Sequence, residues 1–82
     1  MKLEILTPDK TVFEGEVISV TVPGAAGSFE ILKDHAPIIS TLEDGKVIVR
    51  GGGKAENEFF IKGGVVEAIH NNIMVLAEGV TE

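Results

Sequence analysis

The chain contains no cysteine, no tryptophan and no tyrosine. The lack of cysteine excludes disulfide bridges and thiolate metal sites, and it favours a reducing compartment. Binding pockets for sugars and peptides commonly use Trp and Tyr, so the lack of both counts against such a pocket. Phenylalanine therefore supplies all of the aromatic content, at four positions.

Basic residues are also few. The 82 residues include 7 Lys and Arg against 13 Asp and Glu, which gives a formal net charge of −6. A nucleic-acid-binding surface needs a basic patch that displaces counterions, so this balance argues against a nucleic-acid partner. The acidic residues are scattered along the chain, a pattern that indicates a solvated surface.

Long apolar runs are missing as well. No segment approaches the roughly 18–20 apolar residues that a membrane-spanning helix needs. Glu4 interrupts the first apolar residues, so the amino-terminal segment does not have the pattern of a signal peptide. We therefore expect any association with a membrane to come through a protein partner.

What the sequence does contain is alternation with a period of two, together with 44% hydrophobic residues. Such alternation is typical of strands buried on one side, and the β-branched residues that dominate the runs favour strands. Nine strands are expected, over residues 2–6, 11–14, 17–22, 28–32, 37–42, 46–50, 57–62, 65–69 and 73–77. The chain is expected to be all-β, a sandwich or barrel, with residues 1–82 forming one domain.

Turn signals separate these expected strands. Asp44-Gly45 suits a tight hairpin because both residues tolerate positive φ, and Asn71-Asn72 has similar potential. The tail from Glu78 to Glu82 is expected to fray. Of the aromatics, Phe13, Phe29 and one residue of the Phe59-Phe60 pair are expected in the core, which leaves the other residue of the pair for a partner to cover.

His35 is the first candidate for chemistry, because it stands beside Asp34. General acid–base catalysis also needs an oriented partner and a substrate pocket, which Ala36 and Pro37 do not supply. We interpret His35 as a structural or interface histidine. We interpret His70, which precedes two asparagines, as a turn residue.

No metal, cofactor or catalytic site is expected. The two histidines lack metal-ligand spacing, and the carboxylate pairs at 14/16, 43/44 and 56/58 are typical of a solvated face. The run Gly51-Gly52-Gly53-Lys54 suggests a phosphate loop, but Ile48 and Ala55 stand where that motif needs Gly and Ser or Thr. We expect a mobile hairpin loop there instead. The spacing of Gly24 and Gly27 matches an RNA-binding loop in form only, because it lies between strands.

Three segments carry a family resemblance. They are Gly27 to Gly45 with His35-Ala36-Pro37 at its centre, Glu58 to Glu67 with Gly63-Gly64, and Asn72 to Glu78. Together these segments, in this order, resemble the amino-terminal domain of the epsilon subunit of F-type ATP synthases. The resemblance covers nearly the whole chain, but it does not include the carboxy-terminal helical hairpin that most family members carry. The inhibition and ATP binding associated with that hairpin are therefore not carried over.

The resemblance implies a flattened β-sandwich of about ten mostly antiparallel strands. It implies a non-catalytic subunit of the central rotor stalk, which binds the gamma subunit and the c-ring and couples ion translocation to ATP synthesis. It also implies a peripheral location on the cytoplasmic face of the bacterial inner membrane. The positions that match the family's c-ring contacts are Ser28, Glu30, Ile31, Lys33 and Asp34. The positions that match its gamma contacts are Thr7, His35 and Ser40.

A subunit of this size that holds two partners should have partly apolar outer faces. The doubly apolar pairs Ile38-Ile39, Phe59-Phe60 and Val65-Val66 supply side chains for such a face. The alternative function is a free-standing β-sandwich module that binds a sugar or peptide, which predicts a concave pocket with aromatic and polar lining. A small enzyme would need a convergent constellation of side chains, and the sequence contains none.

Overall fold

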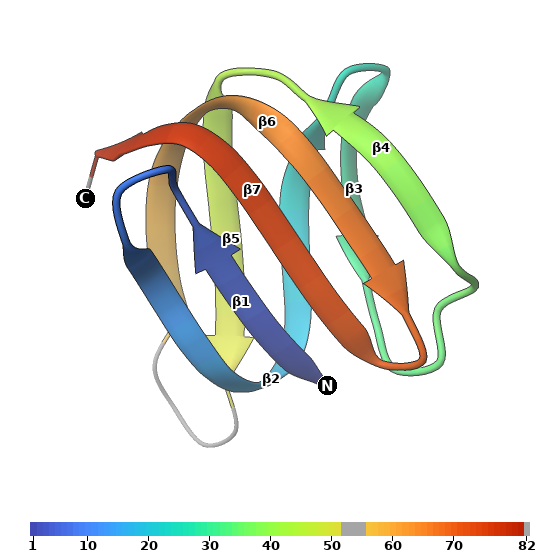
Figure 1. Ribbon diagram of the computed structural model, residues 1–82. Helices are drawn as coiled ribbons and strands as arrows, with labels where there is room; N and C mark the ends of the chain where they lie inside the picture. Colours follow the sequence, from blue (N-terminus) through green and yellow to red (C-terminus); the bar gives the residue numbers. More distant parts are fainter. Residues whose placement is uncertain (52–55, 82) are drawn as a thin grey trace.

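The computed structural model describes residues 1–51 and 56–81, and these residues form strands and turns without a helix (Figure 1). The seven strands are β1 (Lys2–Leu6), β2 (Thr11–Gly24), β3 (Gly27–Ile31), β4 (Ile38–Leu42), β5 (Gly45–Gly51), β6 (Glu56–Ile69) and β7 (Asn72–Thr81). The predicted all-β class is confirmed. Within the described ranges no helix has the length and apolar character that crossing a membrane requires.

All seven strands belong to one sheet that closes on itself through β1, β7, β6, β5 and β2. The pairings are antiparallel except for β1 with β7, which is parallel. The sheet is flattened into two layers. In Figure 1 the strands β1, β7 and β4 lie in the front layer with part of β6, and β3 and β5 lie behind them.

The two 14-residue strands connect the layers, because each changes partner along its length. The first half of β6 pairs with β5, its second half pairs with β4, and β7 runs along its other edge. In the same way, the first half of β2 pairs with β1 and the second half pairs with β3 and β5. Among the described residues, β4 pairs with β2 at one position, Gly24 with Leu42, so the sandwich stays open along most of the side between β3 and β4.

The core is the space between the layers, and alternate residues of every strand fill it. Its fully buried large side chains are Leu3, Ile5, Val20, Val22, Ile31, Val47, Val49, Ile61, Val66 and Val75. Phe13 meets Phe59 edge-on, with ring centroids 5.9 Å apart and an angle of 63° between the planes, a favourable aromatic geometry. Phe59 is buried and Phe60 is exposed, as the alternation predicted.

The structure has seven strands where nine were expected from the pattern. The difference arises because Gly15 and the Gly63-Gly64 pair do not end the strands that contain them. Gly15 pairs with Leu3 inside β2, so the expected strands at 11–14 and 17–22 are one strand. The expected strands at 57–62 and 65–69 are likewise joined in β6, which bends at Gly63 and Gly64 instead of ending there.

Three expected ends and turns also differ. Asp44-Gly45 does not make a hairpin, because β4 and β5 pair with β6 and Gly45 already belongs to β5. The β6–β7 turn uses His70 and Asn71, both with positive φ (49° and 61°), and Asn72 begins β7. Residues 79–81 are paired with β6, so that part of the tail is not frayed. The loop expected at 51–54 lies outside the described residues beyond Gly51.

Gly64 is the residue that the bend in β6 requires. Its φ of 136° is one that residues with a side chain rarely adopt, and a Cβ there would fall on the carbonyl oxygen of Leu76 and 3.0 Å from Cα of Ala77. These atoms belong to the backbone of β7, which is held in its own ladder to β1 and β6. They have no room to move aside.

We expect Gly64→Ala to lower the free energy of unfolding by at least about 2 kcal/mol, through backbone strain and displacement of β7. Chemical denaturation followed by circular dichroism measures this. Gly79→Ala is the matched control, since a Cβ at Gly79 meets nothing within 4 Å. Equal stability of the two variants would contradict the role given to Gly64.

Candidate docking surfaces

The β3–β4 connection and the β6–β7 turn meet at one end of the sandwich. The backbone N–H of Asp34 donates to Oδ1 of Asn71 at 2.7 Å, and Nδ2 of Asn71 donates to Oδ1 of Asp34 at 3.1 Å. Both residues have positive φ, 65° for Asp34 and 61° for Asn71, a conformation that Asp and Asn tolerate better than most residues. This reciprocal pair fixes the connection against the turn.

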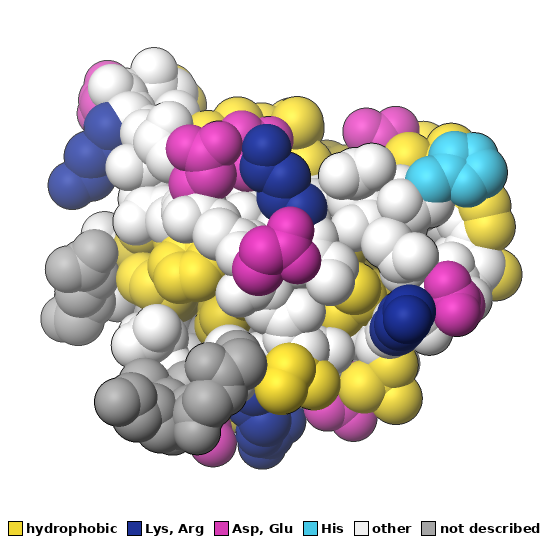
Figure 2. Space-filling model, turned by 90° about the horizontal axis from the view of Figure 1, so that it is seen from below, with side chains coloured by type: hydrophobic (Ala, Val, Ile, Leu, Met, Phe, Trp, Pro, Cys, Tyr) yellow, Lys and Arg dark blue, Asp and Glu magenta, His cyan; other side chains and the backbone are white. Residues whose placement is uncertain are grey.

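His35 and His70 share a hollow of about 280 Å³ at this end, with Asp34, Pro37 and Asn71. The Nδ1 atom of His35 lies 2.7 Å from the carbonyl oxygen of Ala36, and the backbone N–H of His35 donates to the carbonyl of Leu32. Figure 2 looks onto this end and shows a histidine at its periphery, with apolar side chains exposed between charged ones. Across residues 1–51 and 56–81, no group of three His, Cys, Asp or Glu could hold a metal ion.

The predicted c-ring residues occupy β3 and the start of the connection. Ser28 and Glu30 lie on the outer face of β3, and Lys33 and Asp34 are exposed beyond its end. Ile31 does not fit the prediction, because its side chain is only 1% exposed and packs in the core. Strand alternation explains this, since Ile31 points opposite to Glu30.

The free edge of β3 adds backbone groups to this surface. Ser28 is opposite Pro23, which has no N–H and whose carbonyl accepts from the backbone N–H of Glu43. The carbonyl of Pro23 therefore points away from β3. Because Ser28 is directly opposite Pro23, the N–H and C=O of Ser28 point away from β2, toward the free edge of β3. Because strand residues alternate, the same holds for Glu30. Its carboxylate meets Nη1 of Arg50 at 3.4 Å.

The three predicted gamma residues do not form one cluster. His35 lies at the end of the sandwich where β1 begins, whereas Thr7 follows β1 and is bonded to Lys10 in the β1–β2 turn. At about 3.3 Å per residue, β1 alone separates these ends by about 13 Å. Ser40 lies within β4, where its hydroxyl donates to the carbonyl of Thr41 at 3.1 Å. A single partner that touches all three must extend along the sandwich.

One surface was not singled out from the sequence. The outer side of β4, β6, β7 and β1 carries a set of apolar side chains, which we call the outer apolar face. It consists of Leu6, Ile39, Val65, Ile69, Met74 and Leu76. The apolar pairs at 38–39 and 65–66 pointed to two of these residues, Ile39 and Val65. The sequence alone does not show how the four strands align, so it could not bring the other residues together with them.

Comparison with known families matches residues 1–82 to the beta-sandwich domain of the ATP synthase Delta/Epsilon chain. The chain belongs to this family. An ATP synthase epsilon chain of Chlorobium limicola is 45% identical over 80 residues, which cover 98% of this chain and 91% of the relative. The epsilon chain of Chlorobaculum tepidum is 42% identical, with 96% and 90% covered.

Other relatives are longer. The epsilon chain of Sulfurimonas denitrificans is 40% identical over 96% of this chain, which spans 61% of that relative. Among solved structures, a chain of the Euglena gracilis mitochondrial ATP synthase superposes with a TM-score of 0.89 at 18% identity, over 96% of this chain and 51% of that one. A chain of the Tetrahymena thermophila central stalk/c-ring structure gives a TM-score of 0.83 at 20% identity, with 100% and 66% covered. These two likenesses support the fold.

Membership of the family confirms the resemblance seen in the sequence. It confirms a non-catalytic subunit of ATP synthase and favours this function over a free-standing binding module. It also agrees with a peripheral position in a membrane-associated complex. The chain is thus related to a subunit of a larger complex, so the surfaces that could contact other subunits are the candidate functional sites.

We expect Asn71→Gly to lower the free energy of unfolding by about 1–2 kcal/mol, because it removes both hydrogen bonds to Asp34 and keeps the positive φ. Asn71→Ala should cost about 1 kcal/mol more, since alanine resists that φ. Denaturation gives the free energies, and hydrogen exchange at the Asp34 amide reports the lost bond. Unchanged protection of that amide in Asn71→Gly would contradict the pairing.

Proposed function

We propose that this chain works in the central rotor stalk of an F-type ATP synthase, where it docks on gamma and on the c-ring and helps couple ion translocation to ATP synthesis. The observation that carries the proposal is the family match over residues 1–82, with epsilon-chain relatives at 36–45% identity. The proposed location is the cytoplasmic face of a bacterial inner membrane, reached only through partner subunits.

The structure suits a part that transmits force without chemistry. A sheet that closes through five strands resists shear, because sliding one strand would break ladders on both of its edges. The domain measures 25 × 24 × 20 Å along its principal axes. The proposed c-ring residues and the proposed gamma residues occupy different parts of its surface, so both partners can bind at the same time. We assign the c-ring contact to Ser28, Glu30, Lys33 and Asp34, without Ile31, and the gamma contact to Thr7, His35 and Ser40.

Co-purification tests the proposal directly. The chain, expressed together with gamma and the c-ring of its own organism, should be recovered with both after detergent solubilisation. The c-ring alone and gamma alone are the comparison samples. A folded chain that is recovered with neither partner would overturn the proposal.

We expect His35→Ala to weaken gamma binding about fivefold or more, the effect of losing about 1 kcal/mol at an interface. Stability should change little, because among the described residues the half-buried ring has one hydrogen-bond partner, the adjacent Ala36 carbonyl. Isothermal titration and thermal melts separate the two effects. The control is Glu58→Gln on the opposite outer face, which should leave both the gamma affinity and the melting temperature nearly unchanged. A lower melting temperature with unchanged affinity would assign His35 to the fold instead.

A further inference from the structure

The β3–β4 connection is hydrogen-bonded to the rest of the molecule through one side chain, that of Asn71. Its Oδ1 accepts from the backbone N–H of Asp34 at 2.7 Å, and its Nδ2 donates to Oδ1 of Asp34 at 3.1 Å. Among the described residues, the other hydrogen bonds of this connection stay within it and join His35 to the carbonyls of Leu32 and Ala36. The hydrogen-bonded placement of the connection therefore depends on Asn71.

Asp34 has a backbone conformation that needs such support. It is the third residue of a turn that is closed by the N–H of His35 and the carbonyl of Leu32 at 3.1 Å, and its φ is 65°. A turn in which the third residue alone has positive φ is of type II, and such turns favour Gly or Asn there. Lys33 is the exposed second residue of this turn. The bonds from Asn71 thus hold both charged residues of the turn in place.

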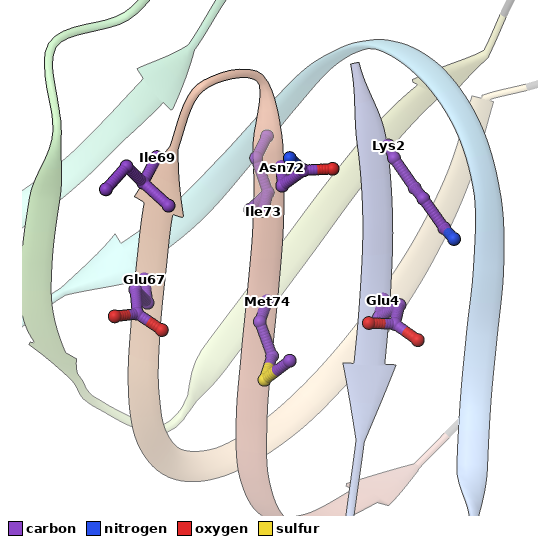
Figure 3. Close-up of a pocket in the computed structure, with 7 residues that line it drawn as sticks. All are labelled: Lys2, Glu4, Glu67, Ile69, Asn72, Ile73 and Met74. Carbon is purple, nitrogen blue, oxygen red and sulfur yellow. The ribbon is translucent and has the colours of Figure 1, made fainter.

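The backbone of Asn71 is itself well fixed. The β6–β7 turn has two central residues, His70 and Asn71, which both have positive φ, the type I′ geometry of tight hairpins. The carbonyl of Asn71 accepts from the N–H of Lys2 at 2.9 Å, and this bond joins the turn to β1. Figure 3 shows Ile69 and Asn72 at the two ends of the turn, beside the start of β1. Asn71 is thus the rigid support, and the β3–β4 connection is the part that it supports.

We propose that Asn71 is a positioning residue for the c-ring contact, which orients Lys33 and Asp34 for the ring without touching the ring itself. This inference rests on the proposed function, which assigns Lys33 and Asp34 to that contact. The pair uses Oδ1 of Asp34, so Oδ2 of Asp34 and the exposed side chain of Lys33 remain for the partner. A segment that is ordered before binding loses less conformational entropy on binding, and this raises its affinity.

The chemistry of the pair offers a specific way to break it and to restore it. Asn71→Asp keeps the acceptor for the N–H of Asp34, but it sets a carboxylate oxygen against Oδ1 of Asp34 where Nδ2 donated before. Two carboxylates at this distance repel each other. When Asp34→Asn is added, the new amide donates to the new carboxylate and both hydrogen bonds return. Asp and Asn both tolerate positive φ, so the exchange suits the backbone at either position.

The test titrates the full chain with the purified c-ring in detergent, well below the melting temperature of every variant. Asn71→Asp should weaken binding about fivefold or more, the factor that corresponds to one lost hydrogen bond. In a chain that already carries Asp34→Asn, the same change should alter the affinity by less than about twofold, whatever Asp34→Asn itself does. Such non-additivity is the signature of direct coupling between the two side chains.

Asn72→Asp is the matched control, because it adds the same charge one residue further along. The side chain of Asn72 donates to the carbonyl of His70 at 3.3 Å and not to Asp34, so its affinity should stay within about twofold of the parent chain. Asn71→Gly keeps the positive φ and removes both bonds without adding charge, so it should weaken binding as Asn71→Asp does. Circular dichroism verifies that each variant is folded. In folded samples a loss of stability alone leaves the affinity unchanged, which separates positioning from a merely structural role.

The outcomes separate this inference from the function on which it rests. If the parent chain binds the c-ring and the Asn71 variants bind equally well, the inference is overturned while the function stands. The same holds if Asn71→Asp weakens binding by one factor whether residue 34 is changed or not. If the parent chain does not bind the c-ring at all, the proposed function fails at this contact and the inference fails with it.

Discussion

The bend of β6 at Gly63 and Gly64 is the constraint on which the architecture depends. Before the bend β6 pairs with β5 in one layer, and after it with β4 in the other, while β7 pairs with β6 from Phe60 to Ile69. A straight β6 would place β4 and β5 in one flat sheet and leave the core without its second wall. Because Gly64 approaches the backbone of β7 so closely, this geometry admits no side chain there. The close contact between Gly64 and β7 allows β6 to bend, and the bend lets the sheet close around the core.

The two outer faces then acquire different roles from their side chains. On β3, β5 and the first half of β6, Arg50 and Lys46 of β5 are matched across strands with glutamates of β3 and β6, which keeps that side solvated. Such exposed pairs contribute little to stability. On β4, β6, β7 and β1 the exposed apolar side chains remain, together with Glu4 and Glu67, which make no ion pair among the described residues.

The period-two pattern was enough to predict strands, the core side of each strand and the opposite orientations of Phe59 and Phe60. It was not enough to tell a bend from an end, because a glycine pair signals both, and β6 was divided at Gly63 for that reason. The position of Ile31 in the core shows the limit of carrying family contacts over by position alone. The outer apolar face was beyond reach because Ile39, Glu67, Met74 and Glu4 become neighbours only through the register of four strands.

The Asp34–Asn71 pair gives the two proposed docking regions a mechanical connection. Asp34 follows β3, on the proposed c-ring side, and Asn71 joins β6 to β7, which carry the outer apolar face. The pair links the β3–β4 connection to the second layer by hydrogen bonds, which matters because β3 and β4 are not paired with each other. Two hydrogen bonds close that open side at its end. A load applied at β3 therefore passes into β6 and β7 through fixed geometry, as a coupling part between two partners requires.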